Sequence, residues 1–157
     1  MHATLGTLLR HLLQLLDGGV ESSYRAVGLG GYRPRYTPVV RALQAHGTSS
    51  IRALADAAGL SHSALSQTVA QMEHAGWVRT APDTDARSKR VSMSPALVEA
   101  LPLLTRHWEA TAKAAASLDQ EIGATLADIA GTAIAALERR PFDDRIRQAL
   151  PKRGKKQ

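Results

Sequence analysis

Apolar residues recur every three or four positions along most of this 157-residue chain, which is the spacing of amphipathic helices. Near the start, six leucines share one helical stripe that is wider than a single neighbouring helix would cover: Leu5, Leu8, Leu9, Leu12, Leu13 and Leu16. The stretch GLGGYRPRY then breaks the pattern, because glycine and proline disfavour helices. The chain is therefore predicted to be mainly helical, and its first helix to need a packing partner.

Two short helices are predicted next. Thr37 and Pro38 have the pattern of an N-cap and a first helical residue, in a helix that stops at Gly47. Ser50 can cap the following helix, which Gly59 can end in a left-handed conformation. The apolar face of that second helix carries Ile51, Leu54, Ala55 and Ala58.

A third helix begins at a cap on Ser61 or Ser63 and extends to about Gly76. Its predicted buried face carries Leu65, Val69 and Met72. The opposite face collects Ser63, Gln67, Ala70 and His74, with Ser66 and Gln71 at its flanks. A helix face without a binding role is usually rich in Lys and Glu, which are strong helix formers. The short hydroxyl and amide side chains on this face instead suit contacts with base edges. A polar surface helix with no partner is the alternative interpretation.

The two helices on either side of the GLS turn form a helix-turn-helix pattern, and a β-hairpin is predicted after it. GWVRTA and RVSMS alternate in polarity, with Val91 and Met93 facing inward, and PDTDARSK supplies the turn residues. Asp83 and Asp85 are expected to brace this loop. Arg87 at its tip suits a minor groove, and Lys89 and Arg90 suit phosphate oxygens.

Positive charge is concentrated in the middle of the chain. The sequence has 20 Lys and Arg against 14 Asp and Glu, a net charge of +6. Residues 24–90 hold nine basic and four acidic side chains, whereas residues 91–150 hold six and eight. A basic middle segment on a less basic scaffold is typical of a module that binds a polyanion. The basic end PKRGKKQ is predicted to add weak nonspecific attraction.

Further helices are predicted towards the C-terminus. Pro95 opens a long helix, which Pro102 is expected to interrupt. The segment IGATLADIAGTAIAALERR places five apolar residues on another helical face: Ile122, Leu126, Ile129, Ala133 and Leu137. These faces need partners, either within one chain or in a second copy.

No enzymatic or metal site is predicted. The chain has no cysteine, and its six histidines include no pair at the i, i+4 spacing of a helical zinc site. No strand-turn-helix nucleophile motif frames its Ser, His and Asp residues, so we expect no cofactor and no catalytic residue. The leucine-rich start is too short and too polar to span a bilayer, and it lacks a secretory leader pattern, which favours the cytoplasm.

The segment from Leu54 to Ser94 resembles the MarR (multiple antibiotic resistance regulator) family of transcription factors. The matching positions in the helical part are Leu54, Ala55, Gly59, Leu60, Ser61, Val69, Met72, Glu73, Gly76 and Val78. The narrower match is the wing, where Asp83, Asp85 and Arg87 have the spacing of the family's Asp-x-Asp-x-Arg pattern. The family's usual Pro after the first Asp is Thr84 here, and its usual Leu-Thr is Met93-Ser94. Neither change removes a contacting group.

The resemblance implies a mainly α winged helix-turn-helix protein with a small β-hairpin wing. It implies a single domain at residues 1–150, with the winged helix at 37–94, dimerisation helices at 1–27 and 95–150, and a basic disordered tail at 151–157. The implied function is a ligand-responsive repressor that binds double-stranded DNA as a homodimer on a palindromic site. DNA contacts are expected from Ser61, Ser63, Ser66, Gln67, Gln71, His74, Arg87, Lys89 and Arg90.

Family members also bind small anionic aromatic compounds between the dimerisation helices and the DNA-binding lobe. The side chains in the corresponding segments are Arg10, His11, Tyr24, Tyr32, Arg33 and Tyr36. Ordinary packing contacts are the alternative role for these residues. The alternative function for the whole chain is a winged-helix protein-interaction module without operator specificity, whose basic wing contacts an acidic partner.

Overall fold

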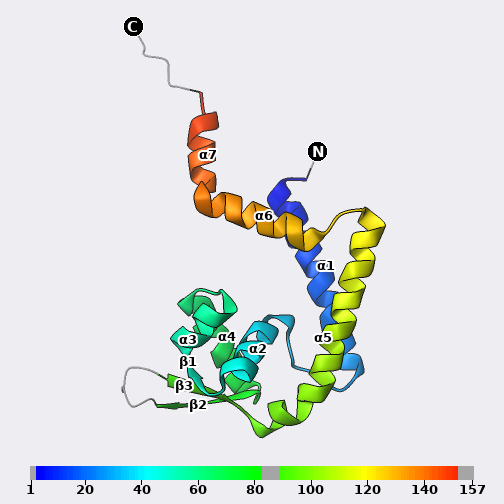
Figure 1. Cartoon of the computed structure of the whole chain (residues 1–157), viewed down its shortest axis with the longest axis vertical. Coiled ribbons are helices and arrows are strands. Elements are labelled where there is room, and N and C mark those ends of the chain that lie inside the picture. Colours follow the sequence, from blue (N-terminus) through cyan, green and yellow to red (C-terminus); the bar gives the residue numbers. More distant parts are fainter. Residues whose placement is uncertain (1–2, 83–88, 152–157) are drawn as a thin grey trace. The chain divides into compact units, whose positions relative to one another are not determined.

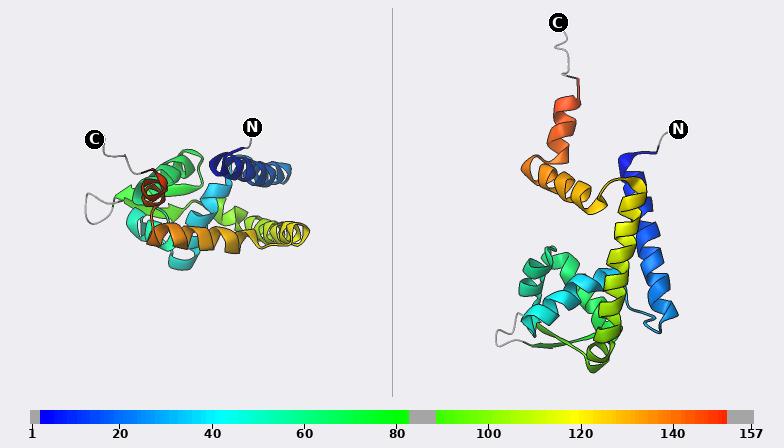
Figure 2. Two further views of the ribbon diagram at one scale, coloured as in Figure 1. Left: turned by 90° about the horizontal axis from the view of Figure 1, so that it is seen from above. Right: turned by 45° about the vertical axis from the view of Figure 1, so that its right-hand side comes forward.

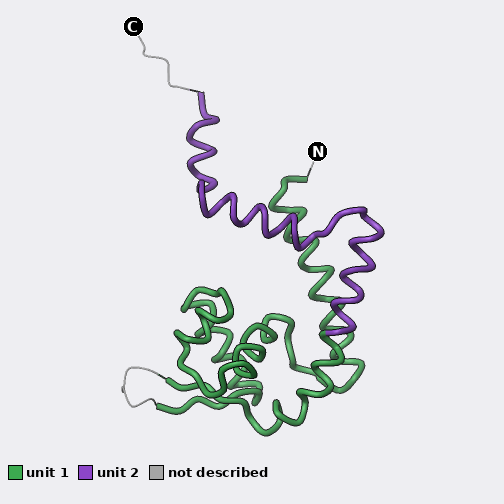
Figure 3. The backbone as a smooth tube through the Cα atoms, viewed as in Figure 1, with its two compact units in different colours: residues 1–108 green, residues 109–157 purple. Residues whose placement is uncertain are grey.

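The computed structural model describes residues 3–82 and 89–151. The chain divides into two compact units, residues 1–108 and residues 109–157 (Figure 3). The predicted wing residues Asp83, Asp85 and Arg87 lie outside the described residues, as does the tail after Pro151.

The first unit begins with helix α1 (Leu5–Ala26), whose N-terminus is capped by the Thr4 hydroxyl accepting from the amide of Thr7 at 3.3 Å. The predicted leucine stripe lies on this helix and is largely exposed, with Leu5 at 68% and Leu13 at 58%. The C-terminal part of α1 is anchored instead by Tyr24, which is buried. The stripe is therefore an apolar helical surface that the described residues leave open to solvent.

A 3₁₀ turn, η1 (Pro34–Tyr36), leads directly into α2 (Thr37–His46), which ends at Gly47 as predicted. Helix α2 lies beside the helix that follows it in the chain (Figure 1). The prediction that Thr37 is the N-cap is wrong. Thr37 already has helical dihedrals, φ −54° and ψ −45°, because the chain turns continuously from η1 into α2. The Thr37 hydroxyl lies 3.4 Å from the hydroxyl of Tyr32 instead.

The next two helices begin and end close to the predicted residues. In α3 (Ile51–Ala58), the Ser50 hydroxyl accepts from the amide of Ala53 at 3.2 Å, and Gly59 adopts φ 65° and ψ 30° at the C-terminus. In α4 (His62–His74), the cap is Ser61. Leu54 and Ala55 of α3 are buried, together with Leu65, Val69 and Met72 of α4.

A small antiparallel sheet completes the winged helix, with strand order β1-β3-β2. Its strands are β1 (Ser49–Ser50), β2 (Val78–Pro82) and β3 (Lys89–Met93). The predicted hairpin is present, with Val78 opposite Met93 and Thr80 opposite Val91. The short β1 strand was not predicted, because its two serines carry no alternating apolar pattern. The sheet packs its buried residues Val78 and Val91 into the helical core.

Helix α5 (Pro95–Ile122) follows Ser94, whose buried hydroxyl accepts from the amide of Leu97 at 3.1 Å. The predicted interruption at Pro102 is wrong, since the helix continues through it. Leu97 and Leu104, on either side of the proline, are fully buried. Their packing offsets a helix-interior proline's cost of about 3 kcal/mol.

Within the first unit, α5 contacts the last turns of α1 (Figure 2). The hydroxyl of Ser23 lies 3.4 Å from Nδ1 of His107, and the rings of Tyr24 and His107 lie 5.1 Å apart. The two helices are therefore joined by both polar and ring contacts.

The second unit contains α6 (Leu126–Arg139) and α7 (Phe142–Ala149) after the end of α5. The predicted single face from Ile122 to Leu137 is wrong, because Gly123 turns the chain at φ 68° and leaves Ile122 on the preceding helix. Arg145 of α7 donates to the Ala136 carbonyl at 3.0 Å, which ties the last two helices together. Within the described ranges, no helix is long and apolar enough to cross a membrane.

Candidate nucleic-acid interface

The start of α4 is held by its own side chains. The Ser61 hydroxyl accepts from the amide of Ala64 at 3.2 Å and lies 3.4 Å from the Ser63 hydroxyl. Ser61 therefore serves as the cap of the helix, and Ser63 is the first hydroxyl on the exposed face.

The two faces of α4 differ sharply in exposure. Leu65, Val69 and Met72 are no more than 2% exposed. Thr68 is also buried, and its hydroxyl donates to the Ala64 carbonyl at 2.9 Å. The exposed face carries Ser63, Gln67, Ala70, Gln71 and His74, with Ser66 half-buried at its flank. This face combines hydroxyl, amide and imidazole groups that can donate to or accept from base edges.

The described part of the wing presents two cations at the start of β3. Lys89 and Arg90 are both exposed. The guanidinium of Arg90 donates to the Thr48 carbonyl at 2.5 Å, which joins β3 to the residue preceding β1. Arg90 is therefore committed to a structural contact as well as being available to a polyanion. Arg87 belongs to the segment outside the described residues.

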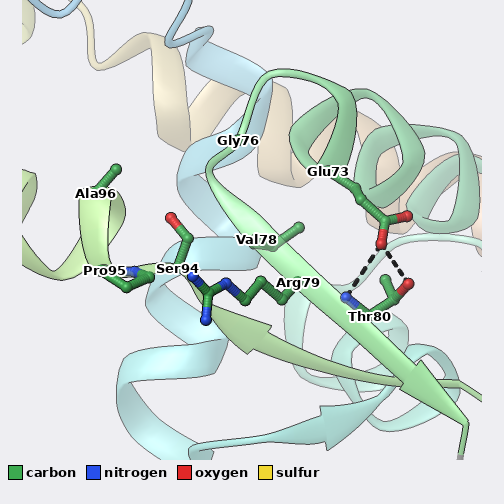
Figure 4. Close-up of a pocket in the computed structure, with 8 residues that line it drawn as sticks. All are labelled: Glu73, Gly76, Val78, Arg79, Thr80, Ser94, Pro95 and Ala96. Carbon is green, nitrogen blue, oxygen red and sulfur yellow. Dashed lines mark hydrogen bonds between the residues drawn. The ribbon is translucent and has the colours of Figure 1, made fainter.

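A contact between α4 and the wing was missed by sequence reasoning. Oε1 of Glu73, near the end of α4, accepts from the amide of Thr80 at 3.1 Å and also from the Thr80 hydroxyl (Figure 4). Thr80 is the middle residue of β2. The family pattern had marked Glu73 without assigning it a role. A carboxylate at the end of a predicted helix, a few residues before a threonine in the following predicted strand, is the signal that could have found the pair.

The same two residues border a surface hollow of about 650 Å³ beside the start of α5. Its lining includes Glu73, Arg79 and Thr80, together with Ser94 and Pro95. The Arg79 side chain extends towards Ser94 and away from Thr80 (Figure 4). Arg79 is a further exposed cation that the sequence analysis treated only as an alternating strand position.

The predicted ligand-pocket residues divide into three core tyrosines and three polar side chains. Tyr24, Tyr32 and Tyr36 are at most 4% exposed and belong to the hydrophobic core. The Tyr32 ring meets those of Tyr24 and Tyr36 edge to face, at 5.1 and 5.7 Å. Burial raises the pKa of Tyr32 well above its ordinary range, an effect that the Thr37 hydroxyl partly opposes. These tyrosines pack against one another in the core, and Tyr36 also borders a hollow.

The polar members of that set lie elsewhere. Arg10 and His11 are exposed on α1. Arg33 pairs with Glu21 at 2.6 Å. Arg33 and Tyr36 also border a second hollow, of about 540 Å³, against the C-terminal half of α4. The rest of its lining is Gly31, Arg35, Ala70, Gln71, His74 and Ala75.

No cluster of three or more metal-ligating side chains occurs in the described residues. Two helices joined by a tight turn, a third helix against them, and a three-stranded sheet ending in a hairpin define a winged helix-turn-helix protein. The MarR family model matches residues 31–88, which include helices α2, α3 and α4 and strands β1 and β2 of the winged helix. The fold class and the family resemblance expected from the sequence are therefore confirmed.

Solved structures of transcriptional regulators share this fold over most of the chain. The regulator MOSR of M. tuberculosis, in complex with DNA, is 20% identical, with a TM-score of 0.66 over 88% of this chain and 99% of its own. A probable transcriptional regulator from Pseudomonas aeruginosa is 22% identical, with a TM-score of 0.55 over 87% and 96%. A cysteine-to-serine mutant of MarR from E. coli is 14% identical, with a TM-score of 0.53 over 90% and 99%. No curated protein matches the sequence.

Proposed function

We propose that this chain is a transcriptional regulator that binds double-stranded DNA sequence-specifically through the exposed face of α4 and the basic wing. The carrying observation is the exposed row of Ser63, Gln67 and Gln71 on a helix whose opposite side is fully packed. An α-helix fits the major groove, and a Gln amide can pair bidentately with adenine. The DNA complex of the structurally similar MOSR supports this proposal.

Charge supports the same assignment. Residues 24–90 include Lys89, Arg90 and Arg79, and the basic excess of that segment would attract phosphates. Arg87, in the segment outside the described residues, is proposed to enter the minor groove from the wing tip. Phosphate contacts would set the register of the protein on the duplex, and the α4 side chains would read its sequence.

The protein is proposed to act as a homodimer, with residues 1–27 and 95–150 as dimerisation segments. In the first unit, the exposed leucines of α1 provide an apolar surface that a second copy could bury. In the second unit, α6 has no buried residue and exposes Ile129, Ile134 and Leu137. A twofold-symmetric dimer would present two α4 helices to the half-sites of a palindrome.

Ligand-controlled repression is proposed as the mode of regulation. The hollow between η1 and α4 supports it, because Arg33, Arg35 and His74 border the same space. A small aromatic carboxylate could meet the two guanidinium groups and the Tyr36 ring, and would lie against the helix proposed to read DNA. Its binding would shift α4 from its DNA-bound position and release the operator.

Selection from a pool of random duplexes, followed by sequencing, tests the function. Enrichment of an inverted repeat is expected for the regulator. A pool that stays random, together with binding to acidic proteins, would overturn the proposal in favour of the protein-interaction module. Adding benzoate-like carboxylates to the selected complex tests the regulation, with release of the duplex as the expected result.

A further inference from the structure

We infer that Glu73 is a positioning residue that sets the angle between α4 and the wing, and thereby contributes to sequence specificity without contacting DNA. The effect on sequence specificity rests on the proposed function, whereas the structural basis of the inference is the contact between Glu73 and Thr80. Oε1 of Glu73 accepts hydrogen bonds from both the amide and the hydroxyl of Thr80 in β2.

The position of Thr80 explains why this contact matters. β2 is an edge strand, since the strand order is β1-β3-β2. Thr80 lies opposite Val91 of β3, yet its amide donates to Glu73 rather than to that partner strand. An unpaired edge amide would otherwise depend on solvent. Glu73 therefore extends the hydrogen bonding of the sheet to α4.

The connection between α4 and β2 is itself held by hydrogen bonds, since the amide of Gly76 donates to the Glu73 carbonyl at 3.0 Å and the amide of Trp77 donates to the Met72 carbonyl at 2.8 Å. The chain between them passes through Ala75, Gly76 and Trp77, and Gly76 adopts φ 80°. These two bonds fix the turn at the end of α4, before β2 begins. The Glu73 contact lies beyond it, at the middle of β2, where it resists a change in the direction of the hairpin.

The negative charge of Glu73 is by itself unfavourable for DNA binding. Glu73 is exposed on the helix proposed to face DNA, and it forms no ion pair with any of the described residues. A carboxylate near phosphates weakens DNA binding. The two hydrogen bonds that Glu73 accepts from Thr80 offset this cost, because they fix the angle between α4 and the hairpin.

Three variants separate this role from charge and from folding. Glu73→Ala removes the acceptor, Glu73→Gln keeps Oε1 but removes the charge, and Glu99→Ala removes an exposed carboxylate from α5 as a matched control. The specificity ratio is the affinity for the selected duplex divided by that for a scrambled one. Because loss of a hydrogen bond alters an equilibrium about three- to tenfold, Glu73→Ala should lower the ratio by that factor. Its affinity for the scrambled duplex should rise.

Glu73→Gln and Glu99→Ala should keep the wild-type ratio. An equal fall in the ratio for Glu73→Ala and Glu99→Ala would attribute the effect to net charge and overturn the inference. So would a Glu73→Gln protein that behaves like Glu73→Ala. Thermal unfolding of each variant checks that the compared proteins are folded.

Hydrogen exchange of the Thr80 amide tests the contact without DNA, so it remains decisive even if the wild-type protein selects no duplex. Exchange should be about three- to tenfold faster in Glu73→Ala than in the wild type and unchanged in Glu73→Gln. Equal protection in the wild type and Glu73→Ala would show that Glu73 does not hold β2. If exchange is faster in Glu73→Ala as expected but the wild type selects no duplex, only the proposed function is overturned.

Discussion

The guanidinium of Arg90 donates to the carbonyl oxygen of Thr48 at 2.5 Å, which ties the first residues of β3 to the loop before β1. Its neighbour Lys89 forms no ion pair with the described residues. The two adjacent cations are therefore expected to respond differently to removal, although the sequence suggested a phosphate contact for both.

Lys89→Ala should make the plot of log affinity against log salt shallower by about 0.9 per subunit, because one phosphate contact is lost. Arg90→Ala should chiefly lower the free energy of unfolding, by about 1 kcal/mol, because the contact with Thr48 is lost. Urea denaturation and DNA titration at several salt concentrations measure the two effects. The reverse pattern would assign the phosphate contact to Arg90.

Gln67→Ala and Ser63→Ala should each relax base preference at one position of each half-site. A good base contact contributes about 1 to 3 kcal/mol of discrimination. Sequencing of duplexes selected by each variant measures the preference. Gln14→Ala, on an exposed position of α1, is the control and should select the wild-type site. Unchanged profiles for both α4 variants would remove these side chains from base readout.

Arg87→Ala should weaken binding to the selected duplex while the melting temperature and the solution mass stay unchanged. Loss of one cation should reduce the salt slope by about 0.9 per subunit. Arg87→Lys should restore the slope better than the affinity, because an ammonium lacks the planar guanidinium suited to a narrow minor groove. Deleting the chain after Leu150 should lower nonspecific affinity without changing the preferred sequence. Wild-type binding by Arg87→Ala would exclude a wing contact with DNA.

Leu9→Glu should convert the proposed dimer into a folded monomer. Leu9 is 50% exposed, so the substitution leaves the core intact, but it would place a charge in the proposed interface. Light scattering measures the mass at micromolar concentration. Gln14→Glu adds the same charge on the opposite side of α1 and should keep the dimer mass. A wild-type protein of monomer mass would contradict dimerisation altogether.

Stability should fall at alkaline pH in a way that depends on Tyr32. Burial raises its pKa above the ordinary value of 10.0, so the folded state keeps the phenol neutral while the unfolded chain ionises it. The contribution is therefore complete below about pH 10 and is lost as pH rises above it, by about 1.4 kcal/mol per pH unit. Tyr32→Phe should flatten this dependence in urea denaturation between about pH 9 and 11. Identical slopes of unfolding free energy against pH in the wild type and Tyr32→Phe would contradict this prediction.

Local signals account for what could be predicted from the sequence. The cap at Ser50, the left-handed glycine at Gly59 and the buried face of α4 each depend on residues within one helix or its ends. The alternation around Val78 and Val91 likewise indicated the hairpin. Because the same segments carry the family motif, the winged-helix class followed from short-range patterns.

Contacts between distant residues account for most of what was missed. Arg90 and Thr48 are 42 positions apart, and no periodicity relates them. The ring contacts of Tyr32 with Tyr24 and Tyr36 join α1 to the segment around η1, and no periodicity indicated them. Pro102 was predicted to break α5, but burial of the leucines around it outweighs a local preference. Tertiary packing thus decided these cases.

Trp77 can serve as an intrinsic fluorescent probe of the hollow between η1 and α4. Its indole N–H donates to the Gly31 carbonyl at 3.3 Å, and its ring meets the Tyr32 ring edge to face at 5.5 Å. Gly31 also borders the hollow between η1 and α4. The sequence has two tryptophans, so Trp108→Phe leaves Trp77 as the single indole fluorophore. Its emission would then report occupancy of that hollow in real time, in unlabelled protein.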